Sequence, residues 1–249
     1  MVSELMTTAN GHKGTPSSAV VEKLQGLRAY LAGRIKGQDH VLDCVCSVLT
    51  RGEFGFAHPQ RPRGSFLLVG PTGVGKTETV NSFTSYLFHG EKPIRFDMSE
   101  YQLQNSVDKL IGENAGDPGL LGRALRGTTR GTLLFDEIEK AHPLLLDLFL
   151  QILEDARITL ATGEILDLHG FYIACTSNIG SAESMRMECV PFASIERTVL
   201  MRVREQLRPE LVGRITDTIV FARLDYATQR DHLRRDGGRR THPVGRAGS

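Results

Sequence analysis

The segment Gly70-Pro-Thr-Gly-Val-Gly-Lys-Thr77 has the residue types and the spacing of a loop that binds phosphate. It satisfies the pattern G-x-x-x-x-G-K-[ST] and lies between a predicted strand and a predicted helix, so a glycine turn that binds nothing is the weaker interpretation. Glycines let the backbone wrap its N–H groups around an anion, and the positive end of the following helix dipole points to the same place. We therefore predict that ATP binds here, with Lys76 reaching the outer phosphates. The predicted contacts are Gly70, Pro71, Thr72, Gly73, Val74, Gly75, Lys76, Thr77 and Glu78.

Two carboxylates follow a second apolar run in Thr132-Leu-Leu-Phe-Asp-Glu137. Asp136 is placed to hold Mg²⁺ through its water shell together with the hydroxyl of Thr77, because Mg²⁺ prefers oxygen ligands and keeps several waters. Glu137 is placed to orient and deprotonate the attacking water. Taken alone, an acidic pair after a strand is equally well explained as a helix cap. Beside a phosphate-binding loop the catalytic interpretation is favoured, and the predicted cofactors are ATP and Mg²⁺.

The elements that must position these residues alternate between helices and strands. Apolar residues recur at helical spacing over 20–31 and 41–49, so two helices precede the first strand. Strands are predicted at 65–69, 94–98, 132–135, 171–176 and 218–221, with helical faces over 80–88 and over 144–153, the latter opened by Pro143. This alternation predicts an α/β fold with a parallel sheet, helices on both faces and ligands at the carboxyl ends of the strands.

The composition is that of an ordinary globular protein. Of the 249 residues 40% are hydrophobic and 24% are charged, and the formal net charge is +1. So small a net charge gives no general attraction for a polyanion, which disfavours nucleic acid as the main partner. The chain has neither a signal peptide nor about 18 consecutive apolar residues, so we expect a cytoplasmic protein with no membrane partner. The cysteines lack the spacing of metal sites and are expected to be reduced thiols of the core: Cys44, Cys46, Cys175 and Cys189.

Three segments are expected along the chain. Residues 1–18 are polar and lack apolar periodicity, which indicates a flexible leader. Residues 19–230 are expected to form one ATPase large domain that includes the two preceding helices. Residues 231–249 are rich in arginine and glycine and almost free of apolar side chains, so we expect a disordered tail.

Five motifs in a fixed order relate the chain to a known family. They are GPTGVGKTE (70–78), DMSEY (97–101), LLFDEIEKAHP (133–143), TSNIG (176–180) and RPELVGRITD (208–217). Together they resemble the second ATPase domain of the Clp/Hsp100 family of AAA+ unfoldases, over about 33–224 of the chain. The resemblance implies an AAA+ P-loop NTPase large domain whose five parallel strands have the order 5-1-4-3-2.

The same resemblance implies roles for three further residues. Asn178 matches the sensor residue near the γ-phosphate, although without the TSN context it would be interpreted as a turn former. Ile35, in Ile35-Lys-Gly-Gln38, matches the apolar contact of the adenine, and a glycine turn between helices is the competing interpretation. Arg214 matches the arginine finger that reaches a neighbouring subunit's γ-phosphate, whereas lone arginines are usually solvated. A ring oligomer, by resemblance a hexamer, is therefore the expected assembly.

The chain departs from the family pattern in three ways. Residues 112–119 (GENAGDPG) stand where the family has a longer loop with an aromatic residue that grips substrate polypeptide. The helical lid of the family has no counterpart in the tail sequence, and its N-terminal domain, middle insertion and first ATPase ring are not found. The leading hypothesis is an ATP-hydrolysing module related to protein-remodelling chaperones, compatible with a polypeptide client. The alternatives are a nucleotide-gated binding module with little hydrolysis or threading and, less favoured, a DNA-associated AAA+ ATPase.

Overall fold

The computed structural model describes residues 18–187 and 190–224. Some expectations of the sequence analysis concern residues outside these ranges. They are the leader except for its last residue, Cys189, the tail, and the end of the chain, where no counterpart of the family's lid was expected. Within the described part, no helix combines the length and the hydropathy needed to cross a bilayer.

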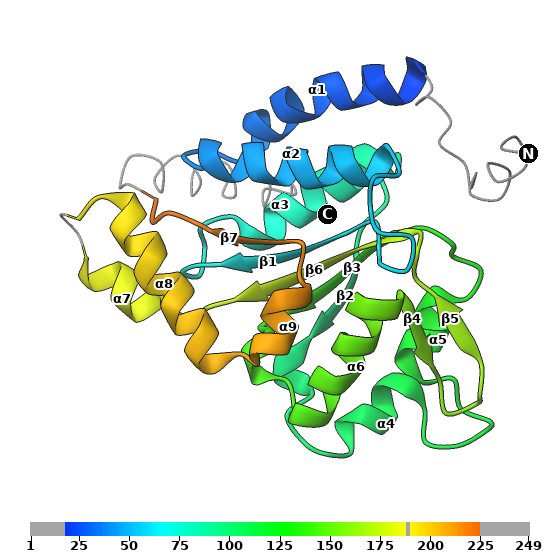
Figure 1. Cartoon of the computed structure of the whole chain (residues 1–249). Helices are drawn as coiled ribbons and strands as arrows, with labels where there is room; N and C mark the ends of the chain where they lie inside the picture. The colour runs from blue at the N-terminus through cyan, green and yellow to red at the C-terminus, as the bar shows by residue number, and fades with distance from the viewer. Residues whose placement is uncertain (1–17, 188–189, 225–249) are drawn as a thin grey trace, which may run out of the picture.

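Five parallel strands form the central sheet (Figure 1). They are β1 (Gly64–Val69), β2 (Ile94–Asp97), β3 (Gly131–Asp136), β6 (Phe171–Ser177) and β7 (Asp217–Val220). Their spatial order is β2-β3-β6-β1-β7. When these five strands are numbered 1 to 5 along the chain and the sheet is read from the β7 edge, the order is 5-1-4-3-2. This order confirms the expectation from the family resemblance. The central strands β1, β3 and β6 are buried along their whole lengths, which explains why they are continuous apolar runs.

One face of the sheet is covered by the N-terminal helices and the helix after the glycine-rich loop. These are α1 (Ser18–Arg34), α2 (Asp39–Glu53) and α3 (Lys76–Leu87). In β1, Phe66 and Leu68 pack into this layer, whereas Leu67 and Val69 belong to the core on the other face. This alternation follows from the two-residue period of a strand. The prediction of two helices before the first strand is confirmed.

In the described residues, the other face is covered by six further helices, with α6 and α9 lying against the sheet in Figure 1. The layer comprises α4 (Ser106–Ile111), α5 (Gly119–Leu125), α6 (Pro143–Asp155), α7 (Ser181–Arg186), α8 (Phe192–Gln206) and α9 (Pro209–Arg214). Two 3-10 turns, η1 (Met98–Glu100) and η2 (Ile138–Lys140), follow β2 and β3. Two short antiparallel strands, β4 (Arg157–Thr159) and β5 (Ile165–Asp167), form a hairpin that the sequence analysis missed. The prediction of helices on both faces is confirmed.

The structure corrects two details of the sequence analysis. The second strand ends at Asp97 rather than at residue 98, because the Asp97 carboxylate accepts hydrogen bonds from the N–H (3.0 Å) and the hydroxyl (2.6 Å) of Ser99 and so begins η1. Among the described cysteines Cys175 is buried, but Cys44 is exposed. The expectation of a core thiol is wrong for Cys44, because it lies at the edge of the face of α2 that buries Val41, Val45 and Val48.

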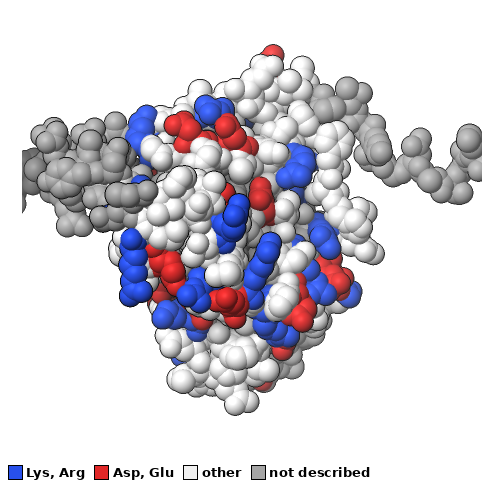
Figure 2. Space-filling model, turned by 60° about the vertical axis from the view of Figure 1, so that its left-hand side comes forward, with Lys and Arg blue, Asp and Glu red and all other residues white. Residues whose placement is uncertain are grey.

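Charged side chains of both signs are interspersed on the face that carries α7 and α8 (Figure 2). Arg202 of α8 contacts two carboxylates at 2.8 Å, those of Glu183 and Glu205. On this face the basic groups therefore stand beside acidic ones and form no continuous stripe.

Candidate active site

The glycine-rich segment forms a tight turn between the carboxyl end of β1 and the start of α3. Gly75 immediately precedes the helix with φ of +103°, a conformation that residues with a side chain rarely adopt. No side chain caps α3. Its first-turn N–H groups are therefore left to an external anion, which is the arrangement of a phosphate-binding helix N-terminus.

The turn borders a cavity of about 800 Å³ at the carboxyl ends of the central strands. Most of the residues predicted from the sequence line it: Ile35, Thr72, Gly73, Val74, Gly75, Lys76, Thr77, Glu78, Asp136, Glu137 and Asn178. Gly70, Pro71 and Arg214 are outside this lining. The cavity also contains side chains to which the sequence analysis gave no role, among them Asn81, Arg95, Asp97 and Thr176.

Lys76 has a partner for each of its three ammonium hydrogens. Its Nζ lies 2.5 Å from the carbonyl oxygen of Gly70, 2.9 Å from that of Pro71 and 2.9 Å from Oδ1 of Asn178. Burial lowers the pKa of this ammonium to about 8, against the opposing effect of the nearby carboxylates of Glu139, Asp136 and Glu137. The first two residues of the loop thus act through main-chain oxygens that hold the lysine head over the cavity. A bound triphosphate would favour the charged ammonium because it adds negative charge beside it.

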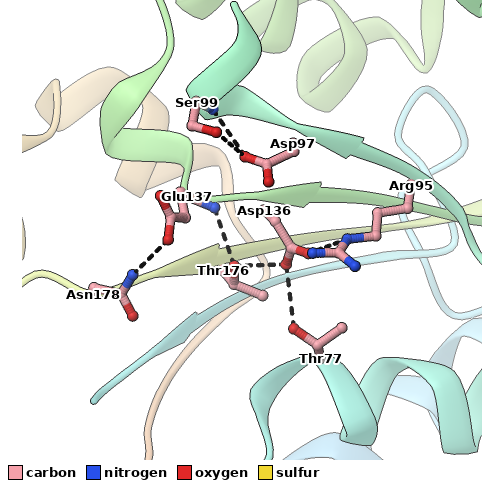
Figure 3. Close-up of polar contacts among 8 residues, drawn as sticks. All are labelled: Thr77, Arg95, Asp97, Ser99, Asp136, Glu137, Thr176 and Asn178. Carbon is pink, nitrogen blue, oxygen red and sulfur yellow. Dashed lines mark hydrogen bonds and ion pairs between the residues drawn. The ribbon is translucent and has the colours of Figure 1, made fainter. Parts of the chain in front are cut away.

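Asp136, at the end of β3, is held by hydroxyl groups from two other elements (Figure 3). Its Oδ1 accepts hydrogen bonds from Thr176 of β6 at 2.8 Å and from Thr77 of α3 at 3.4 Å. The Thr176 hydroxyl also accepts the main-chain N–H of Glu137 at 3.2 Å. Thr176 therefore fixes both acidic residues relative to the neighbouring strand.

The other oxygen of Asp136 has the character of a metal site. Oδ2 is buried and makes no hydrogen bond, although Nε of Arg95 lies 2.5 Å away as an ion pair. The Asp136 side chain is only 5% exposed, and a buried carboxylate requires a positive charge nearby. In this structure Arg95 provides that charge. This carboxylate oxygen and the adjacent Thr77 hydroxyl are hard oxygen ligands, so the residues present fit Mg²⁺.

Glu137 and Asn178 meet directly at the mouth of the site. The side-chain amide of Asn178 donates to Oε1 of Glu137 at 3.1 Å (Figure 3). The Oδ1 atom of Asn178 accepts from Lys76. Glu137 has φ of 55°, and such a conformation in a residue with a side chain costs about 1–3 kcal/mol. The strained backbone and the amide together fix the direction of this carboxylate. A carboxylate held beside a lysine ammonium can accept a proton from a water molecule.

Replacing Thr176 with valine is expected to lower the free energy of unfolding by about 1–3 kcal/mol, because valine keeps the shape but leaves two polar partners unsatisfied. Urea denaturation followed by circular dichroism measures the change. Thr162→Val is the matched control, since its hydroxyl makes only an exposed contact to the N–H of Glu164. That control is expected to change the stability by less than about 0.5 kcal/mol. Equal stability of the two variants would contradict the assigned contacts of Thr176.

The segment around Ile35 forms part of the cavity wall. Ile35 is 4% exposed, and Val74 and Gly75 line the cavity beside it. Gln38, which is fully buried, exchanges two hydrogen bonds with the main chain of Ala222, at 2.7 and 3.0 Å. Gln38 thereby ties this part of the wall to the chain that leaves β7.

Arg214, the last residue of α9, lies outside the cavity of its own chain. Its guanidinium forms an ion pair with Oε2 of Glu154 on α6 at 2.8 Å and is 26% exposed. The structure therefore does not bring Arg214 together with the other predicted site residues.

The sequence analysis gave Arg95 and Thr176 no role because their contacts depend on which strands are neighbours in the sheet. Arg95 lies on β2, which pairs with β3 in the register that sets Asp97 opposite Asp136. Only the strand order places this strand beside the acidic pair, and the order came from the resemblance rather than from residue spacing. Thr176 stands two residues before Asn178 in the quoted motif. Its position at the end of β6, the strand that pairs with β3, was the signal that could have identified it.

A family model described as AAA domain (Cdc48 subfamily) matches residues 61–218. Heat shock protein 100 of Trypanosoma brucei brucei is 40% identical over 211 residues, which cover 82% of this chain and 24% of that protein. Chaperone protein ClpB of Mycoplasmoides gallisepticum is 41% identical over 210 residues, covering 82% of this chain and 28% of that protein. The chain thus spans about a quarter of the length of these curated relatives.

Solved structures of Hsp104 have the same fold. A closed-state cryo-electron microscopy reconstruction of Hsp104 with ATPγS and FITC casein matches with a TM-score of 0.81 and 32% identity, over 90% of this chain and 40% of that one. The Saccharomyces cerevisiae Hsp104–casein complex in an extended conformation matches with a TM-score of 0.80 and 32% identity, over 91% of this chain and 40% of that one.

Proposed function

Because the chain belongs to the Clp/Hsp100 family of AAA+ ATPases, we propose that it binds ATP with Mg²⁺ in the cavity beside Lys76 and hydrolyses it. The observation that carries this proposal is the connected set of contacts from Lys76 through Asn178 to Glu137. These groups come from three separate elements. Their convergence at one cavity is what phosphate binding followed by attack of water requires.

Each residue of the site has a defined task in this proposal. Lys76 and the N–H groups at the start of α3 bind the phosphate oxygens. Thr77 and Asp136 hold Mg²⁺, which when bound offsets the negative charge of the triphosphate. Glu137 accepts a proton from water, and Asn178 keeps that carboxylate oriented.

Lys76→Met is expected to weaken ATP binding about 10- to 100-fold, the worth of one hydrogen bond to a charged group. Methionine keeps most of the stem and removes the ammonium. The dissociation constant of a fluorescent ATP analogue, measured by anisotropy with Mg²⁺ present, tests the change. Lys109→Met, at an exposed position of α4, is the control and should bind like the unmodified protein. If Lys76→Met binds the ATP analogue as tightly as the unmodified protein does, Lys76 is not part of the nucleotide site.

We further propose that the active form is a ring in which Arg214 completes the site of the neighbouring subunit. Support comes from the position of Arg214 outside its own cavity and from its match to the family motif. The Hsp104 structures with casein support a polypeptide client for this module.

A nucleotide-gated binding module is the second candidate function, and the loop at 112–119 favours it. No aromatic residue occurs from 102 to 132. The loop is closed on itself, since a side chain on Gly112 would meet the carbonyl of Asp117 and one on Gly119 would meet the N–H of Gly112. Such a compact loop offers no flat ring with which to hold an extended polypeptide.

ATP turnover measured over a range of protein concentrations separates the two functions. A ring ATPase should gain specific activity as it assembles, because each site requires a second subunit. A binding module should bind ATP and show flat, negligible turnover at every concentration. Mass photometry at the same concentrations reports the assembly independently of activity.

A further inference from the structure

Asn178 is held at two points by carboxylates that come from the same short turn. Its side-chain amide donates to Glu137, and its main-chain N–H donates to Oε1 of Glu139 at 3.0 Å. Both glutamates belong to the residues that connect β3 to α6, with Glu137 preceding η2 and Glu139 inside it. The end of β6 is thus fixed to the turn that carries the proposed base.

Glu139 is otherwise unexplained by the proposed mechanism. Its second oxygen, Oε2, is buried and makes no hydrogen bond. A buried carboxylate oxygen without a hydrogen-bond partner is costly, so the side chain that carries it calls for an explanation. Among the described residues, the hydrogen bond that the structure gives this side chain is the one to residue 178.

The position of Asn178 determines two contacts of the site. Its Oδ1 holds the head of Lys76 at 2.9 Å, and its Nδ2 orients Glu137 at 3.1 Å. The turn after Asn178 is tied by the N–H and hydroxyl of Ser181, which both donate to the Asn178 carbonyl. The N–H on the other side of this residue is the one that Glu139 holds. Loss of that hydrogen bond would release the backbone on the side that faces η2.

We propose that Glu139 is a positioning residue, which sets the Asn178 amide between Lys76 and Glu137 by holding the Asn178 backbone. Glu139 does not line the cavity, so it acts on the reaction through Asn178. This inference rests on the proposed ATPase function. Its structural part, the anchoring of residue 178, is independent of turnover.

Three substitutions test the role through ATP turnover. Glu139→Ala is expected to lower kcat about 10²-fold, since a displacement of about 1 Å at a catalytic group has that effect. Glu139→Gln keeps an oxygen that can accept the Asn178 N–H, so its kcat should stay within about twofold of the unmodified protein. Combined with Asn178→Ala, Glu139→Ala should add less than about twofold to the loss caused by Asn178→Ala alone. A glutamine variant as impaired as the alanine variant, or additive losses in the double variant, would overturn the proposal.

Amide hydrogen exchange resolved by NMR provides a readout without turnover. The Asn178 N–H should exchange about five times faster or more in Glu139→Ala, the effect of losing one hydrogen bond, and should be unchanged in Glu139→Gln. The Ile179 N–H, which donates to the Ser177 hydroxyl at 3.1 Å, is the internal control and should not change. If the unmodified protein fails to hydrolyse ATP, the proposed function fails, while this exchange pattern still decides the role of Glu139. Unaltered exchange at Asn178 in Glu139→Ala would overturn the inference.

Discussion

Arg214→Ala is expected to lower ATP turnover of the assembled protein by about 10³ to 10⁵, the usual worth of an arginine finger. Nucleotide affinity should hardly change, because Arg214 lies outside the cavity of its own chain and pairs with Glu154. Steady-state turnover at a protein concentration that saturates assembly, with a parallel binding titration, measures both quantities.

Arg208→Ala is the matched control for Arg214. Arg208 immediately precedes α9 and pairs with Asp147 of α6 at 2.5 Å, so it makes the same kind of contact to the same helix. Losing an exposed ion pair costs about 0–1 kcal/mol and should leave turnover intact. Mixing Arg214→Ala with Lys76→Met subunits should restore part of the activity, since some sites then combine an intact cavity with an intact arginine. Failure of mixed rings to recover any activity would contradict action between subunits.

Glu137→Gln is expected to keep ATP affinity and to lower turnover by about 10² to 10⁴, the contribution of a positioned general base. Glutamine retains the size of the side chain and an oxygen that can accept from Asn178, so the geometry of the site is preserved while the proton acceptor is lost. Single-turnover hydrolysis of bound ATP isolates this chemical step from product release.

Glu139→Gln is the matched control for Glu137→Gln, since it makes the same replacement two residues away on the same turn. Its turnover is expected to remain near that of the unmodified protein. Rapid hydrolysis by Glu137→Gln would show that another group takes the proton.

The sequence predicted the fold more completely than it predicted the details of the site. The phosphate-binding loop and the acidic pair were predicted because their chemistry lies within short, continuous segments, and the structure brings both to one cavity. The five sheet strands were predicted to within a residue or two, since buried parallel strands are apolar runs. The hairpin of β4 and β5 was missed because its strands have only three residues each, too few to reveal an alternating pattern.

Residue spacing could not predict the contacts between segments that are distant in the sequence. Arg95 and Asp136 are separated by a long stretch of sequence and meet only because β2 lies beside β3. Glu139 was part of a quoted motif, but the hydrogen bond to Asn178 depends on the angle at which η2 leaves its strand. The role of Arg214 stays a prediction that rests on its match to the family motif.

Isothermal titration calorimetry of the purified protein with ATP tests the central claim most directly. The account predicts saturable binding of one ATP per chain in the presence of Mg²⁺, with the binding heat reduced or absent in Lys76→Met. Circular dichroism of both samples checks that each is folded. A folded, unmodified protein that gives no binding heat with ATP and Mg²⁺ would contradict the account.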